Sequence, residues 1–468
     1  MLNTPFGRAI KPEIQRMVQR SQEQTGGLVG LRDDRTAVQE RAKISLVREA
    51  GSIAELDRLL EESKRSCAIV FFTSPTCRPC ITLYPLFDDL SREAEHKAVL
   101  VKVDISRAYD IASKYSVRAT PTFQTFLYGE KENRWSGSDP SQLRGNVEIL
   151  LRMAWPPHPH TNLKLPVLRS TEMRPVLYSK VPPLAKLKVK MGSSLSEDGS
   201  VQGVLNFVST RSTSGASDAT LPNMSTFSHF IQAAPSKLPP EILFTVVDLL
   251  RVALVDPRFS GYFAGEKGHE TIAPLIAHIN DLDKCPYSLR IVTLQLACNL
   301  FSTQLYPEHI LGCDTLSRPI IDLITTSLLD TEHANVRVAA ASLAFNLAAS
   351  NSMSRTNQQK DVLPSDLQIE LAASLLEAIN YEKDNAEAAK GYLLALALLL
   401  YCLPSASGSV EADDGGLVDL LESLEAVEAL KEKKKLFPNE KLIDEVADVL
   451  LPSLRRQGGE NRAVPAGW

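Results

Sequence analysis

Cys77 and Cys80 are the residues whose type and spacing most clearly point to chemistry. Two residues separate them, a short apolar run ends before them at Phe72, and a helical pattern begins at Arg78. Two thiols at the start of a helix are typical of a redox site, because the positive end of the helix dipole stabilises a thiolate on the first cysteine. The spacing predicts dithiol–disulfide exchange, with Cys77 as the exposed nucleophile and Cys80 resolving the mixed disulfide.

The elements that must position this pair follow from the hydrophobic pattern of residues 41–155. Continuous apolar runs at 68–72 and 99–103 are typical of central strands buried on both faces. Predicted helices lie at 53–60, 78–90, 108–115 and 140–153, and an antiparallel strand pair is predicted at 122–128 and 134–135. From the first strand onward, the order is strand-helix-strand-helix-strand-strand-helix, which predicts an α/β domain.

This order, together with Cys77-Arg78-Pro79-Cys80 and the later Thr120-Pro121-Thr122, resembles the thioredoxin fold. The resemblance implies that the Thr120–Pro121 bond is cis and that Pro121 packs against the cysteines and shapes the substrate groove. It also implies thioredoxin reductase or protein disulfides as partners.

The motif departs from the usual thioredoxin pattern at two positions. Thr76 stands where the family has Trp, and Phe71 stands where the family has a buried Asp that assists proton transfer. Lys102 matches the lysine usually paired with that Asp, and Arg78 should lower the pKa of Cys77. Three interpretations therefore remain: retained redox chemistry, a redox-weak scaffold, or a zinc-binding cysteine pair.

Composition limits the other functions of the chain. At 468 residues it is long enough for two or three domains, and its net charge of −5 argues against nucleic-acid binding. Seven cysteines without a secreted disulfide pattern indicate the cytoplasm or the nucleus. No apolar run is long enough to span a membrane. The eight histidines show no ligand spacing, so neither a metal nor a cofactor is expected; His158 and His160 lie in a proline-rich turn expected to be solvated.

Residues 1–40 have the composition of a leader with one short amphipathic helix. The phrase from Leu2 to Pro12 also resembles the tail of the PPPDE papain-like isopeptidases, which in some proteins precede a thioredoxin-like domain and a PUL domain. The resemblance implies that the catalytic His and Cys of such a peptidase would lie upstream of Met1. We therefore expect no peptidase active site in this chain, either because the gene model starts late or because this form lacks the protease.

Residues 156–225 are rich in Pro, Ser, Gly and Thr. Such a composition predicts a disordered linker, because it offers little apolar surface to bury. Within it, residues 184–190 alternate between apolar and polar side chains, which is also compatible with an edge strand or a β-augmentation segment.

Residues 226–460 are patterned as helices almost throughout, with an internal repeat. Residues 288–300 align with 335–347 at an offset of 47 residues, which matches Arg290 with Arg337 and Asn299 with Asn346. This period lies in the HEAT and armadillo range of about 40–47 residues. The repeat predicts an all-α superhelix with a concave groove.

The helical region also resembles the PUL domain, an armadillo-like module named from the phospholipase-A2-activating protein. The resemblance rests on Lys237-Leu238-Pro239-Pro240-Glu241 and on the repeated Asn299 and Asn346 segments. It implies binding of the C-terminal tail of valosin-containing protein, a hexameric AAA ATPase. The Asn299 and Asn346 amides could pair with the backbone of an extended peptide, and Arg290 and Arg337 with an acidic tail. The alternative is that the amides pack helices together and the arginines are solvated.

The sequence thus predicts an adaptor of the ubiquitin or ubiquitin-like pathway, in which a thioredoxin-like domain is tethered to a PUL domain. The alternative is a cytosolic protein-disulfide oxidoreductase that its helical-repeat domain localises. The two functions are compatible and differ in whether Cys77 turns over.

Overall fold

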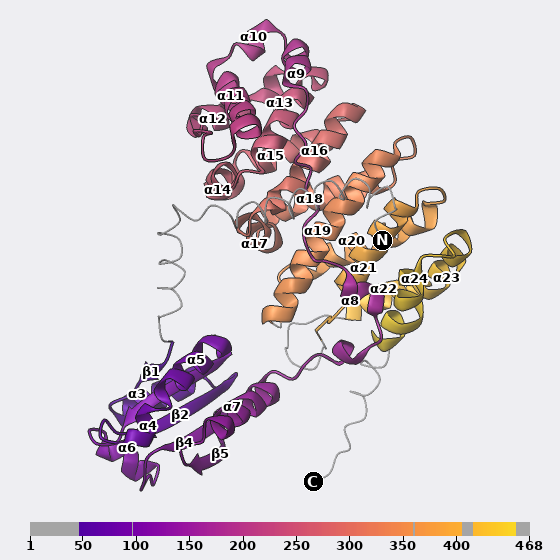
Figure 1. Ribbon diagram of the computed structural model, residues 1–468. Helices are drawn as coiled ribbons and strands as arrows, with labels where there is room; N and C mark the ends of the chain where they lie inside the picture. The colour runs from indigo at the N-terminus through magenta and orange to yellow at the C-terminus, as the bar shows by residue number, and fades with distance from the viewer. Residues whose placement is uncertain (1–45, 96, 359–360, 405–414, 455–468) are drawn as a thin grey trace, which may run out of the picture. The chain divides into compact units, whose positions relative to one another are not determined.

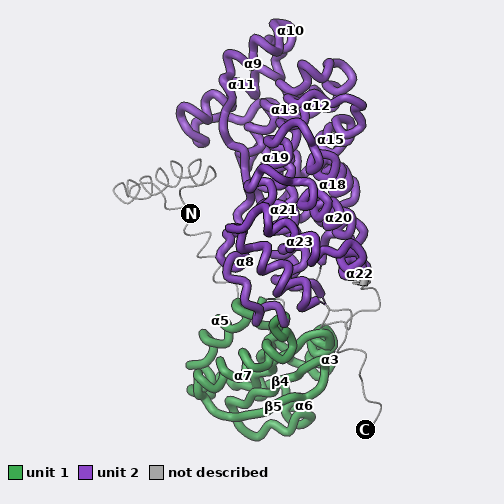
Figure 2. Tube along the Cα trace, turned by 90° about the vertical axis from the view of Figure 1, so that its right-hand side faces the viewer, with its two compact units in different colours: residues 1–158 green, residues 159–468 purple. Residues whose placement is uncertain are grey.

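The computed structural model describes residues 46–95, 97–358, 361–404 and 415–454. The predicted leader at 1–40 lies outside these residues. The chain divides into two compact units, Met1–His158 and Pro159–Trp468, which Figure 2 distinguishes by colour.

The first unit is built on a five-stranded mixed sheet in the order β1-β3-β2-β4-β5. Its strands are β1 (Arg48–Glu49), β2 (Cys67–Thr73), β3 (Ala98–Asp104), β4 (Thr122–Leu127) and β5 (Glu130–Ser136). β1, β3 and β2 run parallel, while β4 and β5 are antiparallel to their neighbours. All seven residues of β2 are buried, as expected for an apolar run in the middle of a covered sheet.

Helices cover both faces of this sheet. They are α3 (Ile53–Glu62), α4 (Arg78–Ile81), α5 (Tyr84–Ala94), α6 (Tyr109–Lys114) and α7 (Pro140–Ala154). α5 and α7 pack with one face of β2, and α3 and α6 pack with the other. The single helix predicted over 78–90 is instead two helices, with Pro85 in the first turn of α5, where its missing N–H is tolerated. The thioredoxin order of elements is otherwise as predicted.

The second unit is all-helical (Figure 1). Its helices are η2 (Pro159–Asn162), α8 (Pro166–Ser170), α9 (Leu184–Met191), α10 (Ser193–Ser196), α11 (Gly199–Ser214), α12 (Met224–Lys237), α13 (Pro240–Ala253), α14 (Pro257–Ala264), η3 (Lys267–His269), α15 (Ile272–Asn280), α16 (Tyr287–Asn299), η4 (Leu300–Ser302), α17 (Leu305–Gly312), α18 (Asp314–Leu328), α19 (Ala334–Gln358), α20 (Ser365–Tyr381), α21 (Ala386–Leu400), α22 (Gly415–Ser423), α23 (Ala426–Leu436), α24 (Lys441–Asp444) and η5 (Glu445–Leu450).

The second unit stacks its helices in two rows. α13, α16, α19 and α21 contact one another in succession and form what we call the inner row, while α15, α18, α20 and α22 form a second row behind it. A Cβ atom at Gly391 of α21 would lie 2.8 Å from the Cβ of Ala341 in α19, so the glycine permits this close approach. The stack confirms the predicted armadillo-like repeat architecture.

The predicted disordered linker over 156–225 is wrong. This segment contains α8, α9, α10 and α11 and belongs to the second unit. Its sparse apolar residues, among them Leu168, Leu187 and Phe207, are buried against the superhelix rather than in a core of their own. The prediction from composition assumes that a segment orders only when it buries its own apolar side chains together. Here those side chains are buried against neighbouring helices of the second unit instead.

Residues 184–190, predicted as an edge strand or linker, form helix α9. Between α8 and α9 the chain has no regular secondary structure over residues 171–183, a segment we call the strap. Figure 1 shows the strap running from α8 past α19 and α16 toward α9. Its direction is therefore opposite to the order of the repeats.

Candidate functional site

Cys77 and Cys80 form a disulfide at the start of α4. Cys77 is the N-cap residue of this helix, and its Sγ accepts a hydrogen bond from the N–H of Cys80 at 3.2 Å. Cys77 is half-buried, whereas Cys80 is fully buried. Of the two sulfurs, the one at Cys77 is therefore the more accessible to a substrate, and it has an N–H donor that would stabilise a thiolate.

Phe71, at the position where thioredoxins have a buried Asp, completes an aromatic cluster behind the disulfide. Its ring stacks on Phe123 at 4.4 Å and meets the edge of Phe87 at 5.2 Å. Phe71 and Cys80 share one buried hydrophobic cluster. Because a phenyl ring cannot exchange protons, it cannot take the proton that Cys80 must lose during resolution.

Lys102 pairs with Asp88 of α5 rather than with a residue of β2. Its Nζ lies 2.8 Å from Asp88 Oδ1 and over the ring of Tyr84, at 4.8 Å from the ring centre. The Tyr84 hydroxyl in turn shares a hydrogen bond of 2.8 Å with Thr73 Oγ1 at the end of β2. Asp88 is a residue that the sequence analysis did not find, because the family pattern directed attention to position 71.

The Thr120–Pro121 peptide bond is cis, which is the geometry that the thioredoxin resemblance implied. Thr122 fixes the end of this loop, since its Oγ1 contacts Ala119 O and Ser136 Oγ, each at 2.7 Å. The first unit therefore combines a disulfide at a helix start with a cis-proline loop.

Asn299 and Asn346 both hold the backbone of the strap. Asn299 Oδ1 accepts from the N–H of Tyr178 at 2.7 Å, and its Nδ2 donates to Tyr178 O at 3.1 Å. Asn346 repeats this two-way pairing at Val176, at 2.7 Å to the N–H and 2.9 Å to the carbonyl. The predicted pairing of these amides with an extended peptide therefore occurs, but the peptide is a segment of the same chain.

The same two amides also join neighbouring helices. Asn299 Nδ2 donates to Arg251 O of α13 at 2.8 Å, and Asn346 Nδ2 lies 3.5 Å from Cys298 O of α16. Both asparagines are almost completely buried. The two interpretations that the sequence left open, helix packing and peptide binding, therefore both apply to each side chain.

Arg251 and Tyr178 complete the strap's binding site, and the sequence analysis identified neither. The Arg251 guanidinium donates to the carbonyls of Tyr178 and of Lys180, the latter at 3.0 Å, and it forms an ion pair with Asp248. The Tyr178 hydroxyl lies 3.2 Å from Ser342 Oγ, and burial raises its pKa well above the usual value. Only the tertiary structure places these residues on the path of one segment.

The segment that precedes the strap, residues 159–170, is also anchored to the second unit by hydrogen bonds. Glu445 accepts from the N–H groups of Val167 and Leu168 at 2.6 and 3.0 Å, at the start of α8. His160 is fully buried, and its Nδ1 accepts from the N–H of Cys402 at 2.9 Å. The predicted solvation of His160 is therefore wrong: its ring is a structural anchor.

The Arg337 guanidinium has partners within the protein. Its Nε lies 2.7 Å from Glu382 Oε2, and its Nη1 donates to Asp330 O at 2.9 Å, so the predicted role in binding an acidic tail is wrong for this residue. Arg290 is half-buried beside Asn280, with Nη1 3.4 Å from Asn280 Oδ1. The sequence pattern placed both arginines near helix starts, where internal partners are available.

The buried pair of Arg337 and Glu382 predicts a pH-dependent stability. Burial acts to raise the pKa of Glu382, but hydrogen bonds from Arg337 and from two backbone N–H groups outweigh it and hold the pKa below its usual 4.5. The stability that the carboxylate contributes is therefore complete above pH 4.5 and is lost as the pH falls through the lowered pKa. We expect Glu382→Gln to cost about 3 kcal/mol at pH 7 and to flatten the loss of stability between about pH 5 and 3, as measured by urea unfolding.

A matched control for this prediction is Asp366→Asn, which removes one acidic partner of the exposed Arg318. Because exposed ion pairs contribute about 0–1 kcal/mol, this variant should behave like the parent protein. Equal pH profiles for the parent and Glu382→Gln would contradict the prediction.

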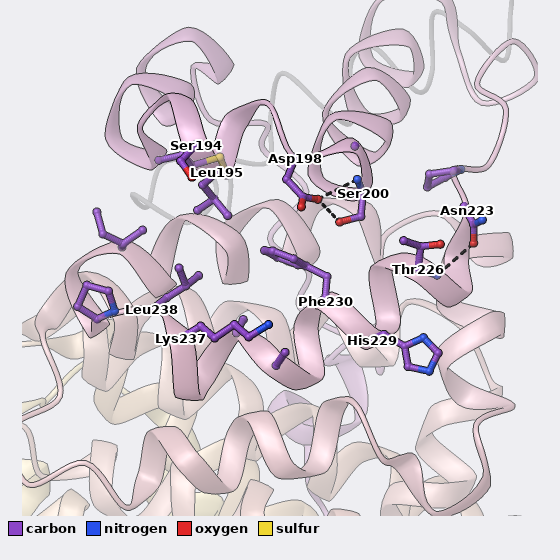
Figure 3. Close-up of a pocket in the computed structure, with 17 residues that line it drawn as sticks. Ser194, Leu195, Asp198, Ser200, Asn223, Thr226, His229, Phe230, Lys237 and Leu238 are labelled. Carbon is purple, nitrogen blue, oxygen red and sulfur yellow. Dashed lines mark hydrogen bonds between the residues drawn. The ribbon is translucent and has the colours of Figure 1, made fainter.

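Figure 3 shows a pocket of about 860 Å³ between α10, α11, α12 and the start of α13. Two of its polar residues cap helices: Asp198 accepts from the N–H of Ser200 at 2.9 Å, and Asn223 accepts from that of Thr226 at 3.1 Å. The hydrogen bond from the Ser200 hydroxyl is the main cause that lowers the pKa of Asp198. These polar groups of the pocket therefore serve as helix caps.

Two searches of the described residues bear on cofactors and membranes. Nowhere in 46–95, 97–358, 361–404 or 415–454 do three or more His, Cys, Asp or Glu side chains gather as a metal site would require. In the same residues, no helix is both long and apolar enough to cross a bilayer.

Comparisons with known proteins match both units. A family model of the PUL domain matches residues 171–448, and a thioredoxin model matches residues 52–148. Thioredoxin of Oryctolagus cuniculus is 30% identical over 106 residues, which cover 23% of this chain and 100% of that protein. Chloroplastic thioredoxin Y of Oryza sativa subsp. japonica is 29% identical over 126 residues, covering 27% of this chain and 74% of that protein. The solved Fasciola hepatica thioredoxin is 31% identical and covers 22% of this chain and 98% of its own, with a TM-score of 0.21.

The PUL match begins at residue 171, the first residue of the strap. The family pattern therefore includes the segment that the inner row holds, in agreement with the hydrogen bonds at Asn299 and Asn346. The chain belongs to the PUL-domain family and carries a thioredoxin domain ahead of its PUL domain.

Proposed function

We propose that this chain is an adaptor of the ubiquitin or ubiquitin-like pathway whose PUL domain binds the C-terminal tail of a valosin-containing-protein-type AAA ATPase. The PUL match over residues 171–448 carries the proposal, because PUL domains are known to bind this ATPase. The five cysteines outside the disulfide are unpaired, which favours a reducing compartment such as the cytoplasm or the nucleus.

The test is binding of the full chain to the hexameric ATPase. We expect binding in the micromolar range or tighter by calorimetry, and no binding to the same hexamer lacking its C-terminal tail. The fragment 226–460, which the sequence alone would select as the domain, lacks the strap and α8–α11 and is unsuitable. Equal binding of the tailless hexamer would contradict the proposal.

We also propose that the first unit is a dithiol–disulfide oxidoreductase. The observation that favours it is the pairing of Cys77 and Cys80 at a helix start, with the buried cysteine behind the more accessible one. In the reduced protein, the Cys77 thiolate attacks one sulfur of a substrate disulfide, and the other substrate sulfur leaves as a thiolate. Cys80, once deprotonated, attacks Cys77 Sγ and releases the second substrate thiol, which leaves the Cys77–Cys80 disulfide.

The oxidised pair then needs two electrons from outside. NADPH supplies them through thioredoxin reductase, which we propose as the second partner. Because Phe71 offers no proton acceptor beside Cys80, we expect the resolving step to be slower than in thioredoxins with a carboxylate at this position.

A further inference from the structure

The strap uses only one of its two backbone edges. The N–H and C=O groups of Val176 and Tyr178 point toward the inner row, where Asn346 and Asn299 bind them. In an extended chain, the groups of alternate residues point to opposite sides. The intervening Leu177 and the following Ser179 therefore turn their N–H and C=O groups away from the amides, and among the described residues no partner binds these groups.

The strap and its flanks are also strongly basic. Residues 164–190 contain seven Lys or Arg residues and one acidic residue, Glu172, in a chain whose net charge is −5. The Arg174 side chain is 83% exposed and lies 3.6 Å from Glu172, an exposed pair that contributes little. Lys180, Lys186 and Lys188 are exposed, and no carboxylate of a described residue lies within ion-pair distance of them.

The other lysine-rich stretch of the chain, residues 431–435, behaves differently. Lys431, Lys434 and Lys435 pair with Asp448, Asp444 and Glu432 on the same group of helices. Ion pairs within the protein therefore compensate these three lysines, whereas Lys180, Lys186 and Lys188 have no such partner among the described residues. The uncompensated charge therefore coincides with the unpaired backbone edge.

From this coincidence we propose that the strap is a template on which an extended, acidic peptide docks, pairing with the free edge at Leu177 and Ser179 and with the cations of Arg174 and Lys180. The inference rests on the proposed binding of an ATPase tail and specifies where that tail binds. Extended peptides add to an exposed strand edge through main-chain hydrogen bonds, and flanking charges set which peptide is accepted.

The prolines of the strap delimit this template. Pro175, Pro182 and Pro183 lack an N–H, so the free donors of the edge are confined to the short stretch between them. Lysines and prolines on an edge also discourage pairing with another copy of the same strand. The lysines do not repel an acidic peptide, so such a peptide can approach the edge. A nucleic acid or a lipid surface offers no backbone with alternating N–H and C=O groups to pair with it.

The asparagines themselves are not the site of the incoming peptide. The strap is tethered at both ends, by Glu445 on α8 and by the packing of α9 on α13, so it occupies the inner row at a high effective concentration. A free peptide at micromolar concentration cannot displace it. The strap is therefore a fixed part of the docking surface.

The test measures binding of a fluorescein-labelled peptide of the ATPase C-terminal tail to the full chain by fluorescence anisotropy. We expect Arg174→Glu/Lys180→Glu to weaken binding by at least about tenfold. Lys431→Glu/Lys435→Glu changes the net charge equally on helix α23 and should leave affinity within about twofold. Leu177→Pro removes one exposed N–H without touching the asparagines and should weaken binding by about tenfold.

The sign of the effect of Tyr178→Ala separates a template from a competitor. A loosened strap should bind the tail more weakly if the strap is the template, and tighter binding would overturn the inference. If the parent protein binds the tail peptide and Arg174→Glu/Lys180→Glu binds it with the same affinity, the inference is overturned and the proposed function stays intact. A parent that binds neither tail nor hexamer removes the proposed function itself. Tighter binding of oligouridylate or phosphatidylserine vesicles than of the peptide, lost in the same variant, would also overturn it.

Discussion

Cys77→Ser is expected to abolish the reduction of insulin by this protein in the presence of thioredoxin reductase and NADPH. No other thiol of the first unit can replace Cys77 as the nucleophile. Cys80 is fully buried, and so is Cys67, which is the one remaining cysteine in the sequence of this unit. Burial raises the pKa of Cys67 to about 12, so at neutral pH it stays a thiol and does not attack disulfides. We expect the rate to fall at least about 100-fold, to the background of the assay.

Cys80→Ser should separate attack from resolution. Cys77 can still form a mixed disulfide with the substrate, but no second thiol is present to release it. The variant should therefore accumulate a covalent complex whose disulfide bond a reducing agent cleaves. Cys313→Ser, which changes a half-buried free cysteine of the PUL domain, is the matched control and should keep full activity. An inactive parent protein would eliminate the oxidoreductase and leave the first unit as a scaffold.

Much of the first unit could be predicted, because its signals are local. The buried β2 run, the C-x-x-C pair and the Thr120-Pro121 dipeptide each depend on a few adjacent residues. The partner of Lys102 could not be predicted in the same way, since Asp88 meets it only across the packing of α5 on β3.

The second unit shows the converse limit. The repeat predicted the stack, and the matched positions predicted that Asn299 and Asn346 share a role, because a helical repeat returns equivalent residues to one face. The repeat could not show which extended segment these asparagines bind. Val176 lies 170 residues from Asn346 in sequence, and Tyr178 lies 121 residues from Asn299. Proline and serine content then indicated a linker, although external amides satisfy the backbone of the segment.

Because the strap's backbone relies on these amides for its hydrogen bonds, Asn299→Ala is expected to reduce the stability of the PUL domain strongly. The change removes the acceptor of the Tyr178 N–H and a donor to two carbonyls, those of Tyr178 and Arg251. A buried polar group left without a partner costs about 1–3 kcal/mol, so we expect the PUL domain to lose about 3 kcal/mol of stability. In urea the midpoint of unfolding should fall by about 1 M.

The distribution of tryptophans makes the measurement specific. The three tryptophans are Trp135 and Trp155 in the first unit and Trp468 at the C-terminus, so tryptophan fluorescence mainly follows the thioredoxin domain. Far-UV circular dichroism is dominated by the helices of the PUL domain. Asn299→Ala should therefore move the dichroism transition and leave the Trp135 transition in place.

Asn335→Ala is the matched control, because Asn335 lies on the neighbouring copy of the repeat, in α19, and among the described residues its side chain hydrogen-bonds only to the Tyr287 hydroxyl, at 3.5 Å. It should unfold with the parent. Limited proteolysis with trypsin adds a local readout: if the Asn299 amide holds the strap, Asn299→Ala should be cleaved after Lys180 under conditions in which the parent and Asn335→Ala remain intact. Cleavage at equal rates in all three proteins would mean that Asn346, Arg251 and the flanking helices hold the strap without Asn299. The strap's rigidity would then come from these other contacts rather than from Asn299.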